Sequence, residues 1–209
     1  MKVFWRELKY SFYLIRHPFK GFWDIKHSNC GSLRTALVLF GFYMLTSAAN
    51  GFYNGFLFNP DGGIHYNLYQ GLAMNLLLYL LWGASNWCLT SLFDGEGTFR
   101  DICKFTSYSL LPLSLAQVLL IPLSYILSLQ ESSFYTMVMN IGILWTGLLL
   151  FVGLVVTHQY TVLKAVVITV VTLLGMCIMV YIILLVFNLI QQVFGFVFTF
   201  WRELSLRLT

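Results

Sequence analysis

The stretch VVITVVTLLGMCIMVYIILLVFNLI, residues 166–190, contains no charged side chain and decides the class of fold. A helix of about 20 such residues crosses the ~30 Å hydrocarbon core of a bilayer, and a helix satisfies its own backbone hydrogen bonds in lipid. The sequence therefore predicts a transmembrane helix from Val166 to Ile190. Four earlier charge-free stretches predict four more spans: Ala36–Phe58, Tyr69–Phe93, Tyr108–Leu129 and Phe134–Val156.

The composition of the whole chain indicates the same class. Of its 209 residues, 59% are hydrophobic and only 10% are charged, whereas an ordinary soluble domain has about 25% charged residues. A soluble monomer cannot hide so much apolar surface. A soluble enzyme, a disordered regulator, a disulfide scaffold and a nucleic-acid-binding module are therefore excluded. We predict an all-α protein, a polytopic transmembrane helical bundle of five spans.

The basic residues predict how this bundle is oriented. If the gaps between spans alternate sides, ten Lys and Arg residues lie on the side of the N-terminus and two on the other side. The positive-inside rule then places the N-terminus in the cytosol, and five spans place the C-terminus outside. We expect a multi-pass protein of the cytoplasmic membrane, or of the Golgi or endoplasmic reticulum membrane if the chain is eukaryotic.

Residues 1–16 have the pattern of an amphipathic helix that lies in the headgroup region and faces anionic lipids. Its apolar face combines Phe4, Trp5, Leu8, Phe12 and Ile15, and its basic face combines Lys2, Arg6, Lys9 and Arg16. Pro18 disfavours helix at His17 and suits the first position of a second helix. We divide the chain into a basic interfacial segment (1–34), a five-span domain (35–190) and an interfacial tail (191–209). The tail is expected to continue the last helix and to emerge or bend along the outer interface, with a re-entrant tail as the alternative.

The loop FDGEGTFRDICK, residues 93–104, combines turn and helix-start signals. Thr98 followed by Asp101 is a capping box, which predicts a helix that begins near Phe99. The carboxylates do not have the spacing of an EF-hand, so we interpret them as turn and cap residues with a salt bridge to Arg100 or Lys104. A second hypothesis is that the acids of this loop, Asp94, Glu96 and Asp101, pair with bases of the N-terminal segment across the cytosolic face, which a charge swap at Asp101 would test.

The predicted spans hold amides and hydroxyls but no charged residue or histidine at mid-membrane depth. This absence disfavours an ion-coupled carrier. We expect these polar groups to bond across helices, at about 0.6 kcal/mol each, with a polar translocation path as the alternative. They are Asn50, Asn54, Asn75, Ser85, Asn86, Gln117 and Asn140. Gly51 and Gly55 form a GxxxG pattern, which favours close helix packing within the protein or in a dimer.

No residues form a catalytic, cofactor or metal-binding pattern. None of the histidines and cysteines has a metal-ligand spacing, and no nucleophile motif is present. We therefore predict a protein that is not an enzyme and has no cofactor. One pentapeptide, Phe4–Leu8 (FWREL), recurs unchanged as Phe200–Leu204. We interpret the two copies as interfacial caps of similar chemistry, because their flanks do not match.

The segments HPFKGFWDIK (17–26) and FDGEGTFRDI (93–102), followed by Pro112, resemble the Yip domain family of small five-span membrane proteins, the Ypt/Rab-interacting proteins and their bacterial relatives. The resemblance extends from about Trp5 to Ile190. It implies a cytosolic N-terminus and a non-enzymatic role, and eukaryotic members look like Rab GTPase adaptors in early secretory traffic. The chain lacks their long polar arm and its D-L-Y-G-P type motif, so it is more similar to the bacterial branch.

The function predicted from these observations is a membrane scaffold or adaptor. It would recruit or stabilise a membrane or cytosolic partner, in membrane trafficking or in a transport system. Anionic lipids and a protein partner or a further copy are expected to bind, and nucleic acid is not. The alternative is a transport subunit or a lipid-handling, scramblase-like channel that uses Asn75, Asn86 and Gln117. The resemblance assigns partner binding on the cytosolic face to His17, Pro18, Phe19, Gly21, Phe22, Trp23 and Asp24, with Asp94, Gly95, Gly97, Thr98 and Asp101.

Overall fold

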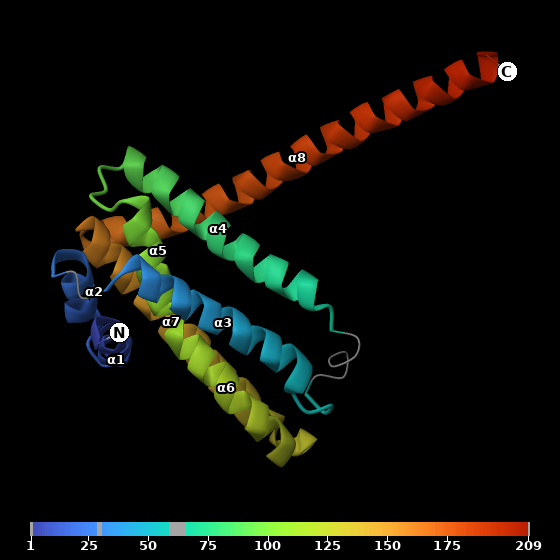
Figure 1. Cartoon of the computed structure of the whole chain (residues 1–209). Coiled ribbons are helices and arrows are strands. Elements are labelled where there is room, and N and C mark those ends of the chain that lie inside the picture. The colour runs from blue at the N-terminus through green and yellow to red at the C-terminus, as the bar shows by residue number, and fades with distance from the viewer. Residues whose placement is uncertain (1, 29–30, 59–65, 209) are drawn as a thin grey trace.

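The computed structural model describes residues 2–28, 31–58 and 66–208, and within them it contains helices and no strand (Figure 1). The predicted all-α class is therefore confirmed. The elements are α1 (Lys2–Arg16), α2 (Pro18–His27), α3 (Leu33–Tyr53), α4 (Leu68–Leu92), α5 (Phe99–Ser109), α6 (Leu111–Ile126), the single 3-10 turn η2 (Leu129–Glu131), α7 (Ser132–His158) and α8 (Val162–Leu208).

Five segments are long and apolar enough to cross a membrane, as the sequence predicted. They are Leu33–Tyr53, Leu68–Leu92, Phe99–Ile126, Leu129–His158 and Val162–Glu203. The third begins nine residues earlier than predicted, because α5 and α6 follow each other with only Leu110 between them. Pro112 lies in the first turn of α6, where its missing N–H breaks no helix hydrogen bond.

The N-terminal segment forms two helices that meet at His17, with Pro18 at the start of α2, as predicted. However, the most buried residues of α1 do not lie on its predicted apolar face, of which Leu8 and Ile15 are half-buried and Ile15 packs against the core. Its buried residues are Glu7, Ser11 and Leu14, which lie along one edge of the helix. Phe12 remains 51% exposed. The side chains of Phe4 and Trp5 lie outside the described part of the chain, so the placement of the aromatic face in the headgroup region stays a prediction.

The buried core lies at the end of the bundle where α1 and α2 pack (Figure 1). Short α5 is its centre and is buried from Phe105 to Ser109. Contacts between α5 and both α3 and α7, and between α2 and α7, enclose it. Its largest side chains, all less than 2% exposed, include Leu14, Phe22, Ile102, Phe105, Tyr108, Leu149, Leu154 and Ile168.

Polar side chains join the spans to one another, which confirms most of the predicted interhelical bonds. Asn50 Nδ2 donates to the Gln117 carbonyl at 3.0 Å, and Asn75 Nδ2 donates to Ser47 Oγ at 2.8 Å. Two of the seven predicted groups differ: Asn86 is buried without a hydrogen-bond partner among the described residues, and Asn140 is exposed. Other bonds between these segments include Thr46–Gln117, Asn54–Tyr135 and Ser85–Thr172.

The two glycines of the predicted GxxxG pattern lie at the end of the bundle opposite the core. Helix α3 ends at Tyr53, so Gly55 lies beyond it. A methyl group on Gly55 would lie 2.6 Å from the backbone oxygen of Ser124, and one on Gly51 would lie 2.5 Å from the ring of Tyr66. In the structure both glycines therefore make close contacts within the chain.

Helix α8 is continuous from Val162 to Leu208, so residues 191–208 continue the last helix as expected. Its first half packs against α4, and its second half extends away from the bundle (Figure 1). Every side chain from Val180 to Glu203 is exposed. The placement of this half along the outer interface stays a prediction.

Candidate docking surface at the charged end

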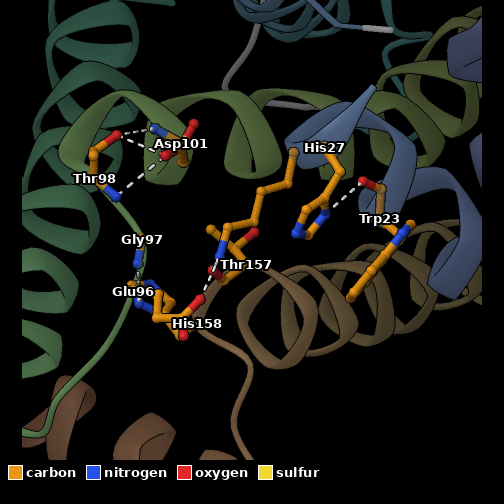
Figure 2. A network of polar contacts seen from close by, with 9 residues as sticks. Trp23, His27, Glu96, Gly97, Thr98, Asp101, Thr157 and His158 are labelled. Atoms are coloured by element: carbon orange, nitrogen blue, oxygen red, sulfur yellow. Dashed lines mark hydrogen bonds and ion pairs between the residues drawn. The ribbon is translucent and has the colours of Figure 1, made fainter. Parts of the chain in front are cut away.

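Three distant parts of the chain meet at one end of the bundle (Figure 2). They are α2, the loop 93–98 with the start of α5, and the end of α7 with the turn 159–161. We call this region the charged end. It holds both sequence segments that were singled out above, together with residues from α7 that were not.

The loop 93–98 wraps around two stacked rings. The rings of His158 and Tyr160 lie 5.5 Å apart at an interplanar angle of 17°. His158 Nδ1 accepts a hydrogen bond from the Gly97 N–H at 3.3 Å, and Tyr160 Oη donates to the Phe93 carbonyl at 3.1 Å. Burial, and then the charge of Asp94, raise the pKa of Tyr160, so its hydroxyl remains a donor.

This contact explains the two glycines of the loop. A methyl group on Gly95 would lie 2.6 Å from both His158 Nδ1 and Tyr160 Oη, and one on Gly97 would lie 2.6 Å from His158 Cε1. The neighbouring Asp94 has a φ of 54°, in the left-handed region that Asp tolerates better than most residues. The loop thus needs small residues because it lies directly on the His158 ring.

Lys26 links α2 to both other parts of the charged end. Its Nζ donates to the Thr157 carbonyl at 2.7 Å and lies 3.3 Å from Glu96 Oε2. Thr157 is in the last turn of α7, where carbonyl groups lack partners and the helix dipole is negative. A single ammonium therefore satisfies the end of α7 and pairs with the loop.

The start of α5 carries the predicted capping box. Thr98 Oγ1 accepts from the Asp101 N–H at 3.4 Å, and Asp101 Oδ2 accepts from the Thr98 N–H at 3.2 Å. Lys104 Nζ lies 3.2 Å from Asp101 Oδ1. The prediction of a cap and a local salt bridge is confirmed. The hypothesis that an acid of this loop pairs with a base of the N-terminal segment is also confirmed, by Lys26 and Glu96. Asp101 does not take part, because it pairs with Lys104.

A buried carboxylate fixes α1 beside this surface. Glu7 is 7% exposed, and its Oε2 accepts from Ser32 Oγ at 2.7 Å and from Thr35 Oγ1. Burial alone would raise the pKa of Glu7, but the hydrogen bonds from Ser32 and Thr35, with a smaller contribution from Arg6, lower it below its usual value. Ser32 is the N-cap of α3, so the carboxylate lies at the positive end of that helix.

Comparison with known protein families identifies the family of this chain. The sequence matches the family model of the Yip1 domain over residues 12–185. The chain belongs to the Yip1 domain family. With its five apolar helices, it is a multi-pass membrane protein, and the Yip1 family is generally a non-enzymatic one. No curated protein and no solved structure matches the sequence.

In this Yip1 domain, the twelve residues to which the family resemblance assigned partner binding differ in burial and in contacts. Gly21 and Phe22 are buried, and Asp24 accepts a hydrogen bond from Tyr10 Oη at 2.7 Å. The loop glycines contact His158, as described above. Those that begin a helix are Pro18, Thr98 and Asp101. The exposed members are His17, Phe19, Trp23, Asp94 and Thr98.

Three side chains that position this surface are not among the twelve: Glu7, Lys26 and His158. Lys26 lies within the segment 17–26, so its charge could have identified it as a site residue from the sequence. Glu7 and His158 belong to no sequence pattern that could have identified them. Among the described residues, no group of three or more His, Cys, Asp or Glu side chains could hold a metal ion.

Proposed function

We propose that this Yip1 protein is a non-enzymatic membrane scaffold or adaptor whose charged end docks a protein partner. The observation that carries the proposal is the division of α2 into two faces. Phe22 and Ile25 are buried, whereas Phe19 and Trp23 are 59% and 50% exposed. The buried side chains fix the orientation of α2, and this orientation keeps the aromatic rings of Phe19 and Trp23 on the surface.

The surroundings of these rings favour a protein partner in addition to lipid. Trp23 stacks on His27 with ring centroids 4.0 Å apart, and Glu96 is 58% exposed beside Lys26. Aromatic side chains beside exposed charges are typical of protein interfaces. Because Lys26 fixes α2 to the loop and to α7, the surface is preorganised, which lowers the entropic cost of binding.

We place this end in the cytosol and the end around Tyr125 outside, in accordance with the distribution of basic residues. In a chain without its native cysteines, a cysteine at Glu96 should react with an impermeant maleimide only after the cytosolic side is opened. A cysteine at the 68% exposed Tyr125 should react in intact cells. The opposite pattern would reverse the orientation.

Site-specific photocrosslinking tests the docking surface. A benzophenone amino acid at Phe19 or Trp23 should capture one and the same protein. At Phe56, which is 78% exposed at the opposite end, it should not capture that protein. The Glu96→Lys variant should reduce the yield from both positions. Capture of lipid alone, or equal capture from Phe56, would contradict an adaptor role.

The alternative of a transport subunit or a lipid-handling channel has less support. Two of the three amides that would line a path, Asn75 and Gln117, bond to neighbouring helices. Flux of solute or scrambling of lipid by the reconstituted protein, lost in an Asn86→Leu variant, would favour this alternative.

A further inference from the structure

The second half of α8 differs from every other apolar helix of the protein. In its most apolar window only 6% of residues are buried, against 22–39% in the other four candidate spans. Contacts with α4 and α7 involve only the first half, because all side chains from Val180 to Glu203 are exposed. At 1.5 Å per residue, the whole helix is about 70 Å long, more than twice the thickness of a hydrocarbon core.

Three amides interrupt this otherwise apolar half. Asn188, Gln191 and Gln192 are exposed and have no hydrogen-bond partner among the described residues. The amides of Asn50, Asn75 and Gln117 in the earlier spans are bonded across helices. Because an unpaired amide is unfavourable in lipid, the amides of α8 need a partner from another molecule.

Two of these amides, Asn188 and Gln191, lie on one stripe of the helix. Tyr181, Leu184, Asn188, Gln191 and Gly195 follow one another at alternating intervals of three and four residues. This is the spacing of a seam between two helices that pack along their length. Native Cys177, four residues before Tyr181, extends the same stripe.

We propose that α8 pairs in parallel with α8 of a second copy of this chain along the stripe. Copies of one chain share one orientation in a membrane, so a two-fold axis along the pair brings Asn188 opposite Asn188 and Gln191 opposite Gln191. Each amide has both donors and an acceptor, so identical side chains satisfy each other. Gly195 on the same stripe lets the two backbones approach closely.

A second copy fits the stripe better than the headgroup region does. Helices that lie flat on a membrane carry Lys and Arg on their polar face. Between Ala165 and Trp201, α8 has no charged residue at all, and its polar positions are amides, a thiol and hydroxyls. Such uncharged polar groups are those that join helices within a bilayer.

Cysteine crosslinking in native membranes tests the pair. With Cys30, Cys88 and Cys103 replaced by serine, oxidation should produce a band at twice the 24.1 kDa of the chain through native Cys177. Without Cys177, the Leu184→Cys and Gly195→Cys variants should give the same band. Matched cysteines on the opposite face, Ile190→Cys and Val197→Cys, should not.

A measurement of self-association tests the α8 pair without cysteines on the stripe. The double variant Asn188→Leu/Gln191→Leu should weaken self-association in bicelles by about tenfold, because it removes the interhelical amide bonds. The control Ile190→Leu/Val193→Leu should leave it unchanged. Equal crosslinking on both faces, an adduct with a different protein, or labelling of Gly195→Cys by an impermeant maleimide would each overturn the parallel pair. These readouts require no adaptor partner, so they are independent of the proposed function.

Discussion

Helix α1 and the second half of α8 carry the same pentapeptide, FWREL, in opposite settings. In α1 its glutamate, Glu7, is 7% exposed and accepts hydrogen bonds from Ser32 and Thr35. In α8 the equivalent glutamate, Glu203, is exposed, and this half of the helix extends away from the bundle (Figure 1). The same glutamate is therefore buried in one copy of the pentapeptide and exposed in the other.

The difference shows that docking depends on the surface against which the helix packs, and not only on the sequence of the helix. The N-terminus of α3 offers two hydroxyl donors and a positive helix end to the carboxylate of Glu7. Two turns further along α1, Leu14 enters the core against Gly21, whose added methyl group would lie 3.0 Å from Leu14 Cγ. Glu203, by contrast, is exposed on the half of α8 that extends away from the bundle (Figure 1).

The largest expected effect comes from the apolar contact of α1. Leu14→Ala should lower the free energy of unfolding by about 2–5 kcal/mol, because it leaves a cavity in a packed core. Leu189→Ala should change it little, because Leu189 is 63% exposed on α8. Chemical unfolding in detergent measures both. Equal losses would show that the exposed half of α8 is packed in the solubilised protein.

The next effect comes from the carboxylates of the two pentapeptides. Glu7→Ala should lower the stability of the docked α1 by about 1.5–3 kcal/mol, the range for hydrogen bonds to a charged group. Glu203→Ala should have no such effect. Limited trypsin cleavage at the exposed Lys9 and Arg16 measures undocking of α1, since the helix must open locally before a protease can cut its backbone. Unchanged cleavage in the Glu7→Ala variant would contradict a docking role for this carboxylate.

Much of the fold could be predicted from the sequence because its signals are local. Charge-free stretches gave the five spans, Pro18 gave the break between α1 and α2, and Thr98 with Asp101 gave the start of α5. Each signal depends on residues that are neighbours along one helix. The face by which α1 docks could not be found this way, since it depends on the hydroxyls of α3.

The charged end was predictable only in part for the same reason. Basic and acidic segments indicated that α2 and the loop 93–98 would meet. The pairing of Lys26 with Glu96 instead of Asp101 depends on the capping of α5 by Asp101, which occupies that carboxylate. The contact of His158 with the loop joins residues 61 positions apart, and neither sequence pattern pointed to it.

A smaller effect is expected from pH. The pKa of Glu7 is lowered in the folded state below the usual 4.5, so the folded state binds this proton more weakly than the unfolded state. The contribution of Glu7 is therefore complete above about pH 4.5 and is lost as the pH falls through the lowered value. Hydrogen-exchange protection of residues 6–16 should decrease in that acidic range. A Glu7→Gln variant cannot titrate there, so the same decrease in that variant would assign the effect to another acid.

The smallest effect should come from the Lys26–Glu96 pair, because Glu96 is 58% exposed and water screens such pairs. A double-mutant cycle with Lys26→Met and Glu96→Gln should give a coupling energy of about 0.2–1 kcal/mol for unfolding. Lys26→Met alone should cost more than Glu96→Gln, because it also removes the bond to the Thr157 carbonyl. The same cycle between Lys26 and Asp101 should give no coupling. Strong coupling to Asp101 would contradict the pairing of Lys26 with Glu96.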